Sequence, residues 1–261
     1  MDKRKSYARQ GRRYLEQGHH EKALEYFDKA IESDGKLDSW LGKAEVLVQL
    51  KRYAEALQCF DMAIDLAGDA ACWHGKGSAL LQAGMIEKAV ECFDNAIKLK
   101  PDYSDAWLGK GESLHKLQKL DEAANCYSAA VKINPDNAFA WKNLGDILRL
   151  TTSGYPEAVK CYNKALDLYE KHLKQNPKDC QAWRKKSLAA SALGLDAEYK
   201  RCYDSAIACY QQRLKSNPDD AVAWYSLAAM PVGQLSSFLK TSEEYLGKAK
   251  ALGMNIKSPA K

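Results

Sequence analysis

The residues of this chain with the most chemical potential are its eight cysteines, because thiols form disulfides, bind metals or act as nucleophiles. Five of them occupy the same position of a recurring pattern, directly before an aromatic residue of an expected second helix: Cys59, Cys92, Cys126, Cys161 and Cys202. That recurrence indicates small, semi-buried helix residues, too far apart to be joined by disulfides. Cys72, Cys180 and Cys209 show neither C-x-x-C spacing nor a metal pattern. We therefore expect reduced cysteines throughout.

The five histidines predict no metal site, because neither an H-x3-H pair nor an H-E-x-x-H motif occurs. Glycine-rich dinucleotide loops, Walker loops and G-x-S-x-G nucleophile elbows are absent from the sequence as well. We predict that the protein is not an enzyme and requires no cofactor or metal. His74 and His115 are better explained as contacts for a binding partner than as ligands or catalysts.

The six tryptophans mark an internal repeat. Their intervals are 33, 34, 34, 42 and 41 residues, and Tyr7 opens the series 33 residues before the first: Trp40, Trp73, Trp107, Trp141, Trp183 and Trp224. A small residue follows four positions after each anchor: Gly11, Ala44, Gly77, Gly111, Gly145, Ser187 and Ala228. Further on, an aromatic residue recurs, and an alanine follows it three positions later: Phe27, Phe60, Phe93, Tyr127, Tyr162 and Tyr203. Several repeats close with proline: Pro101, Pro135, Pro177 and Pro218.

This pattern resembles the tetratricopeptide repeat, a helix–turn–helix unit of about 34 residues. The resemblance covers about residues 4–252. Small residues let two helices approach closely, large rings fill the space around the contact, and proline ends the second helix. The implied fold is all-α, a right-handed α-solenoid of about seven repeats.

We expect one solenoid domain over residues 1–253, followed by a disordered tail at 254–261. The expected repeats span about 4–37, 38–70, 71–103, 104–137, 138–179, 180–220 and 221–253. Repeats five and six are longer, with 12 residues from Ala165 to Pro177 against 5 from Ala130 to Pro135. The difference adds about two helical turns, which we interpret as second helices that project beyond the array. Pro231 and Gly233 interrupt the seventh repeat, and a helix from about Thr241 to Leu252 is expected to cap it.

In tetratricopeptide arrays the first helices line a concave groove that usually captures peptide segments. By that resemblance, the candidate groove residues are Arg9, Arg12, Asp38, Leu41, Glu45, His74, Ser78, Asp105, Leu108, Glu112, Lys142, Asn143, Asp146, Arg184 and Lys185. Gly42, Gly75 and Gly109 occupy equivalent groove positions, and glycine inside a helix costs roughly 0.5–1 kcal/mol. Either something approaches the groove floor closely, or glycine is simply tolerated there.

The candidate groove charges segregate along the chain. Arg9 and Arg12 are basic, the middle repeats offer acidic residues such as Glu45 and Glu112, and Arg184 and Lys185 are basic again. An acidic centre with basic ends favours an extended ligand with basic residues in its middle and acidic ones toward its ends. We therefore predict a protein-interaction scaffold or adaptor that holds an extended peptide or a helix of a partner protein in the groove. The carboxylate clamp that some family members use for chaperone tails is missing, because its places hold Ala8, Arg12, Gly42, Ala71 and Gly75.

Two alternatives remain open. In the first, a basic N-terminal cluster contacts RNA phosphates, although an acidic groove repels nucleic acid: Lys3, Arg4, Lys5, Arg9, Arg12 and Arg13. Apolar residues near the C-terminal end offer a surface for self-assembly: Phe238, Leu239, Tyr245 and Leu246. We expect a monomer or a weak homo-oligomer.

Composition supports a folded chain with a modest surface charge. Hydrophobic residues make up 46%, charged residues 28%, and the formal net charge is +5. That charge is too small and too dispersed for a dedicated nucleic-acid domain. No run of 18 apolar residues exists, and no apolar segment follows the basic N-terminus. We expect a cytoplasmic protein without a membrane span.

Overall fold

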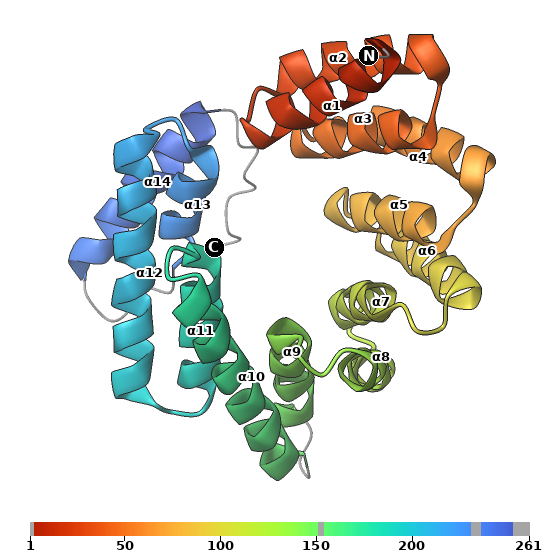
Figure 1. Ribbon diagram of the computed structural model, residues 1–261. Coiled ribbons are helices and arrows are strands. Elements are labelled where there is room, and N and C mark those ends of the chain that lie inside the picture. Colours follow the sequence, from red (N-terminus) through yellow and green to blue (C-terminus); the bar gives the residue numbers. More distant parts are fainter. Residues whose placement is uncertain (1–2, 151–153, 231–235, 253–261) are drawn as a thin grey trace. The chain divides into compact units, whose positions relative to one another are not determined.

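The computed structural model describes residues 3–150, 154–230 and 236–252, with side chains from Tyr7 onward except at 236–243. Within these ranges the chain forms fourteen α-helices and no strand (Figure 1). The predicted all-α fold of helical repeats is confirmed. No helix in the described ranges is both long enough and apolar enough to cross a membrane.

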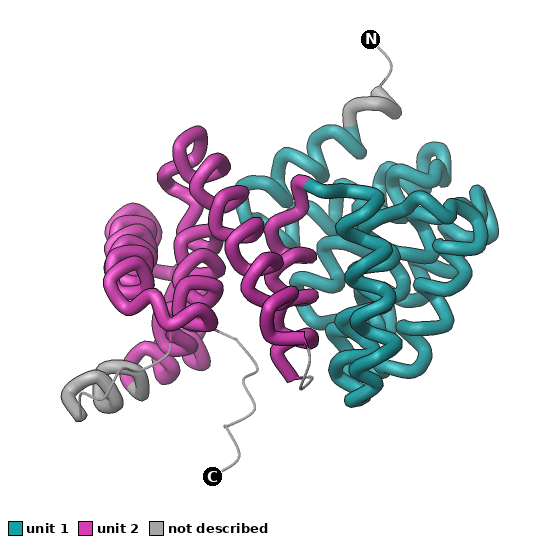
Figure 2. Tube along the Cα trace, turned by 90° about the horizontal axis from the view of Figure 1, so that it is seen from below, with its two compact units in different colours: residues 1–135 teal, residues 136–261 magenta. Residues whose placement is uncertain are grey.

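The chain divides into two compact units, unit 1 at residues 1–135 and unit 2 at residues 136–261 (Figure 2). The helices of unit 1 are α1 (Lys3–Glu16), α2 (His20–Asp34), α3 (Leu37–Gln49), α4 (Tyr53–Ala67), α5 (Ala70–Gln82), α6 (Ile86–Leu99), α7 (Ser104–Lys116) and α8 (Leu120–Ile133). Those of unit 2 are α9 (Ala138–Arg149), α10 (Tyr155–Gln175), α11 (Cys180–Ala192), α12 (Asp196–Ser216), α13 (Ala221–Ala228) and α14 (Ser236–Ala251). A single domain over 1–253 stays a prediction.

The recurring residues form the core of each repeat. On α2, Ala23 and Phe27 are fully buried and Ala30 is nearly so, and the same positions are buried on α4, α6, α8 and α10. The tryptophans are only half-buried, because their rings lie at the start of the first helices. The indole N–H of Trp107 donates to the carbonyl of Pro101 over 2.8 Å, which gives the polar edge a partner.

The second helices of repeats five and six are lengthened, as predicted. Helices α10 and α12 have 21 residues each, whereas α2, α4, α6 and α8 have 14 or 15. The interpretation that the added turns project beyond the array is wrong. Tyr169 and Leu173 are buried against Ala182 of α11, and Tyr210 is buried beside Leu227 of α13.

The C-terminal helix α14 begins earlier than expected, at Ser236 instead of about Thr241. It packs on α13, where the Tyr245 ring lies 5.4 Å from the Trp224 ring, so the predicted capping position is occupied by a helix. Pro231, Gly233 and the tail at 254–261 lie outside the described residues.

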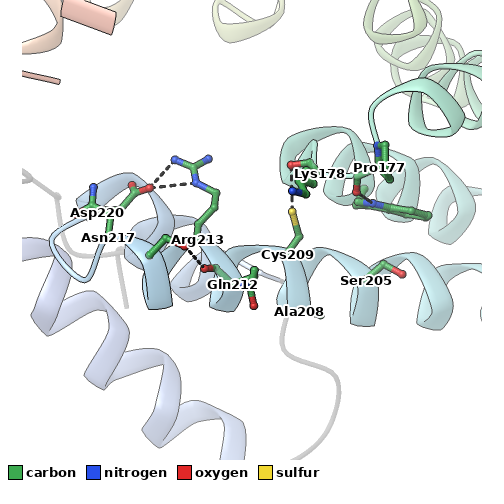
Figure 3. A pocket seen from close by; sticks show the side chains of 11 residues that line it. Pro177, Lys178, Ser205, Ala208, Cys209, Gln212, Arg213, Asn217 and Asp220 are labelled. Carbon is green, nitrogen blue, oxygen red and sulfur yellow. Dashed lines mark hydrogen bonds and ion pairs between the residues drawn. The ribbon is translucent and has the colours of Figure 1, made fainter. Parts of the chain in front are cut away.

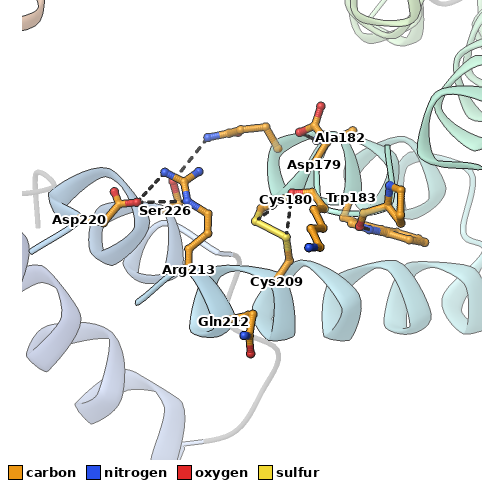
Figure 4. Close-up of a disulfide and its surroundings, with 12 residues drawn as sticks. Asp179, Cys180, Ala182, Trp183, Cys209, Gln212, Arg213, Asp220 and Ser226 are labelled. Atoms are coloured by element: carbon orange, nitrogen blue, oxygen red, sulfur yellow. Dashed lines mark hydrogen bonds and ion pairs between the residues drawn. A yellow bond between two sulfur atoms is a disulfide. The ribbon is translucent and has the colours of Figure 1, made fainter. Parts of the chain in front are cut away.

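Cys180 and Cys209 form a disulfide, with 5.4 Å between their Cα atoms (Figure 4). The expectation of reduced cysteines is therefore wrong for this pair. The two residues are 29 apart in sequence, so no short sequence motif indicates the pair. The added turns of α12 bring Cys209 opposite the start of α11. Among the described residues the five repeated cysteines and Cys72 are free and buried.

Candidate functional site

The candidate site lies on the first helices of unit 1. In Figure 1, α3, α5 and α7 follow one another along one side of this unit, with α4, α6 and α8 behind them. A hollow of about 320 Å³ opens between α5 and α7. Five predicted groove residues line it together: His74 and Ser78 from α5, and Asp105, Leu108 and Glu112 from α7.

His74 is held in this hollow by aromatic neighbours. Its ring lies 5.7 Å from the ring of Phe93 and 5.2 Å from that of Tyr103. Burial lowers the pKa of His74, and the nearby Asp105 carboxylate opposes that shift. The imidazole is therefore neutral at neutral pH and can both donate and accept a hydrogen bond.

Asp105 and Glu112 give the hollow its negative charge, because no lysine or arginine is among the residues that line it. The apolar surface comes from Leu81, Phe93 and Leu108. A mixture of carboxylates, one neutral imidazole and apolar wall suits a basic or amphipathic side chain of a polypeptide better than an anion.

The remaining groove residues of unit 1 are less concentrated. Arg12 of α1 and Asp38 of α3 form an ion pair, and the contact raises the pKa of Arg12. Because the two charges neutralise each other, the predicted contrast between a basic first repeat and acidic middle repeats is weaker than expected. Arg9 and Glu45 are exposed, whereas Leu41 packs against the core around Phe27 and Phe60.

Several candidate groove residues of unit 2 already contact other side chains. Lys142 Nζ lies 2.5 Å from Asp146, which also accepts a hydrogen bond of 2.8 Å from the Tyr162 hydroxyl. Asn143 is buried. Arg184 Nε lies 3.4 Å from Gln181, and Lys185 Nζ lies 4.3 Å from the centre of the Phe139 ring. No metal-binding group of three His, Cys, Asp or Glu residues occurs in the described ranges.

The family is decided by sequence comparison. A family model for the tetratricopeptide repeat matches residues 8–71, 74–138, 113–172 and 191–230, which together span more than half of the chain. The chain belongs to the tetratricopeptide repeat family. The comparison with curated proteins found no match.

Solved structures of other tetratricopeptide proteins share the fold. MamA from Desulfovibrio magneticus RS-1 is 20% identical with a TM-score of 0.56, covering 66% of this chain and 97% of its own. PilF from Pseudomonas aeruginosa is 19% identical with a TM-score of 0.56, covering 87% and 97%. YrrB, a protein with an unusual peptide-binding site, is 24% identical with a TM-score of 0.50, covering 64% and 87%. At these identities the likeness concerns the fold alone.

The glycines at the candidate groove positions have a structural explanation. A Cβ built on Gly109 would lie 2.5 Å from the Phe93 ring, and one on Gly75 would lie 2.6 Å from the Phe60 ring. Gly42 faces Phe27 at a similarly short distance. The close approach comes from the second-helix phenylalanine of the preceding repeat, so the suggestion that a ligand approaches the floor is unnecessary.

Sequence reasoning missed a larger hollow in unit 2. It has a volume of about 670 Å³ and lies between the start of α11 and the added turns of α12 (Figure 3). Its walls include Lys178, Trp183, Cys209 and Arg213. The lengthened second helix was the sequence signal for this hollow, because turns added past the neighbouring loop leave a recess beside the helix.

Proposed function

We propose that the first helices of unit 1 bind an extended, basic segment of a partner polypeptide, and that the protein acts as a non-catalytic scaffold. The observation that carries this proposal is the hollow between α5 and α7. It gathers five predicted groove residues around two carboxylates, and neither lysine nor arginine lines it.

A lysine or arginine of the partner fits between Asp105 and Glu112, while its aliphatic stem lies on Leu108. His74 then supplies a neutral donor and acceptor for the partner's backbone. Four first helices at about 9–10 Å spacing span roughly 28 Å, which an extended segment crosses with about eight or nine residues.

The structure gives less support to the two alternatives, RNA binding and self-assembly. Arg12, part of the basic cluster considered for RNA, is already paired with Asp38. Tyr245, considered for self-assembly, packs on Trp224 within the same chain. The side chains of Lys3, Arg4, Lys5, Phe238 and Leu239 lie outside the described residues. A cytoplasmic, monomeric or weakly associating scaffold remains part of the proposal.

Fluorescence anisotropy with two labelled extended peptides, identical except for a central lysine or glutamate, tests this proposal on the full-length protein. We expect tighter binding of the lysine peptide, and Glu112→Lys should weaken that binding by about tenfold, the effect of roughly 1.4 kcal/mol. Glu91→Lys, on the exposed side of α6, is the matched control and should leave binding unchanged. Equal affinity of both peptides, or an equal effect of both variants, contradicts the proposal.

A further inference from the structure

The Cys180–Cys209 disulfide joins a buried sulfur to an accessible one. Cys180 is 2% exposed at the first position of α11. Cys209 is only partly buried and lines the hollow of about 670 Å³ described above (Figure 3). An incoming nucleophile can therefore reach the bond from the Cys209 side.

The surroundings of Cys209 match a small anionic molecule. The indole of Trp183 forms one wall, and the Gln212 amide offers a hydrogen-bond donor. The hydroxyls of Ser205 and Ser216 already donate to the backbone carbonyls of Arg201 and Gln212. Arg213 and Asp220 bind each other at 2.5 Å, and Asp220 also caps α13, so these two charges offset each other. The exposed Lys178 then leaves the hollow with a positive rim.

We propose that Cys209 is a thiol–disulfide exchange site for a small anionic thiol of the glutathione class, with Cys180 as the resolving cysteine. The thiolate of the small molecule attacks Cys209 Sγ, a new sulfur–sulfur bond forms, and Cys180 leaves as a thiolate. A second small thiol attacks the outer sulfur of the mixed disulfide. That step releases the oxidised small-molecule disulfide and leaves two reduced protein cysteines.

The leaving sulfur sits where negative charge is stabilised. Cys180 opens the 13-residue helix α11, whose macrodipole favours an anion at this end. The neighbouring Asp179 carboxylate is itself engaged, because it accepts from the Ala182 amide over 2.9 Å and pairs with His172 at 2.9 Å. The reverse reaction uses the same geometry, since the Cys180 thiolate is held beside any adduct on Cys209.

The site belongs to one repeat alone. Counting from the tryptophans and from Ala165 and Ala206, the residues equivalent to the cysteine pair in the preceding repeat are Ala138 and Leu168, which have no thiol. The free cysteines are buried, and desolvation raises the pKa of thiols such as Cys126 and Cys161 to about 11. They are therefore poor nucleophiles near neutral pH, and modification should be confined to Cys209.

Peptide-resolved mass spectrometry of the full chain after treatment with glutathione disulfide tests the assignment. In Cys180→Ala the resolving thiol is gone, so we expect one stable glutathione adduct, on Cys209. In the matched variant Cys209→Ala, the buried Cys180 should react at least tenfold more slowly. Untreated wild-type protein should show the Cys180–Cys209 peptide pair. Adducts spread over the buried cysteines, or equal reaction of the two variants, overturn the proposal. Circular dichroism confirms that both variants remain helical.

Charge-reversal variants distinguish an anion-selective site from a thiol that is merely accessible to solvent. In the Cys180→Ala background, Lys178→Glu should slow adduct formation by glutathione disulfide about tenfold, the effect of changing two unit charges about 6 Å away in water. The same substitution should speed the reaction with cystamine, which is cationic. Lys215→Glu, an exposed residue of α12 that does not line the hollow, is the control. Identical responses to Lys178→Glu and Lys215→Glu contradict an anion-selective site. These results are independent of peptide binding by unit 1.

Discussion

Unit 1 and unit 2 use the same repeat position in different ways. Three residues after the tryptophan, unit 1 carries Lys43, Lys76 and Lys110, each paired with an aspartate on the preceding second helix. These side chains are 22–26% exposed and their partners about half exposed. In unit 2 the equivalent Lys186 is 3% exposed and is bound by both Glu170 and Glu198. The same repeat position therefore carries partly exposed ion pairs in unit 1 and a buried lysine held by two partly exposed carboxylates in unit 2.

The contrast extends to how neighbouring repeats are joined. Unit 1 uses glycines that accept a phenylalanine ring, whereas the same position in unit 2 holds Asn143, Lys185 and Ser226. Unit 2 adds longer second helices and a disulfide. Repeats that share one core pattern can therefore obtain their interfaces from close backbone approach or from added side-chain contacts.

The largest effect should follow from removing the disulfide. A bond that closes a loop of about 29 residues stabilises by roughly 3.5 kcal/mol in the chain-entropy treatment. Cys209→Ala should therefore speed hydrogen exchange in α11 and α12 while leaving α3 to α6 unchanged. Exchange rates in α11 that match the wild type would contradict a stabilising role for the bond.

Replacing the buried lysine should come next. Lys186→Met leaves Glu170 and Glu198 close together without their cation, and we expect a loss of about 2–3 kcal/mol, reduced from the fully buried case because both carboxylates are partly exposed. Lys76→Met removes an exposed pair and should cost below about 1 kcal/mol. Urea unfolding followed by helix-resolved hydrogen exchange compares the two variants. Equal losses would mean that burial of this position is unimportant.

A substitution at one of the repeat-equivalent glycines, Gly42, Gly75 and Gly109, should have a somewhat smaller effect on stability. Gly109→Leu forces a side chain into the buried Phe93 ring and should destabilise unit 1 by about 1–3 kcal/mol. The equivalent position of unit 2, Lys185, already accommodates a side chain, so Lys185→Leu should change stability by less than about 0.5 kcal/mol. Thermal unfolding of both variants measures the difference, and a neutral Gly109→Leu would show that the ring can move aside.

The smallest difference concerns pH. Burial keeps the pKa of folded His74 below its unfolded value near 6.5, so the unfolded chain binds the extra proton and unit 1 loses stability as pH falls through that value. In unit 2, hydrogen bonds from Arg201 and Lys186 lower the pKa of Glu198 to about 2, so its contribution is lost only below pH 4.5. When the pH is lowered from 7 to 5.5, hydrogen exchange should show reduced protection of the α5 amides and unchanged protection of the α12 amides. His74→Gln should remove the response in α5.

The repeated core was predictable from sequence because its residues recur with the tryptophans. Ala23 and Phe27 are buried where the pattern placed them, and so are their counterparts on α4, α6, α8 and α10. The placement of the candidate site residues was predictable only in part: His74 and Leu108 line one hollow, but the pairing of Arg12 with Asp38 depends on side-chain reach between helices. The disulfide was missed because its cysteines are 29 residues apart and meet only when α12 is two turns longer.

The central claim, that the hollow between α5 and α7 holds a basic polypeptide segment, is tested most directly by photocrosslinking. A benzophenone side chain placed at Leu108 should crosslink the lysine-centred peptide near its central residue. The same group at Leu99, which is 54% exposed on α6, should give little product. Crosslinking from Leu99 that equals or exceeds crosslinking from Leu108 would place the peptide outside the first-helix wall and contradict the account.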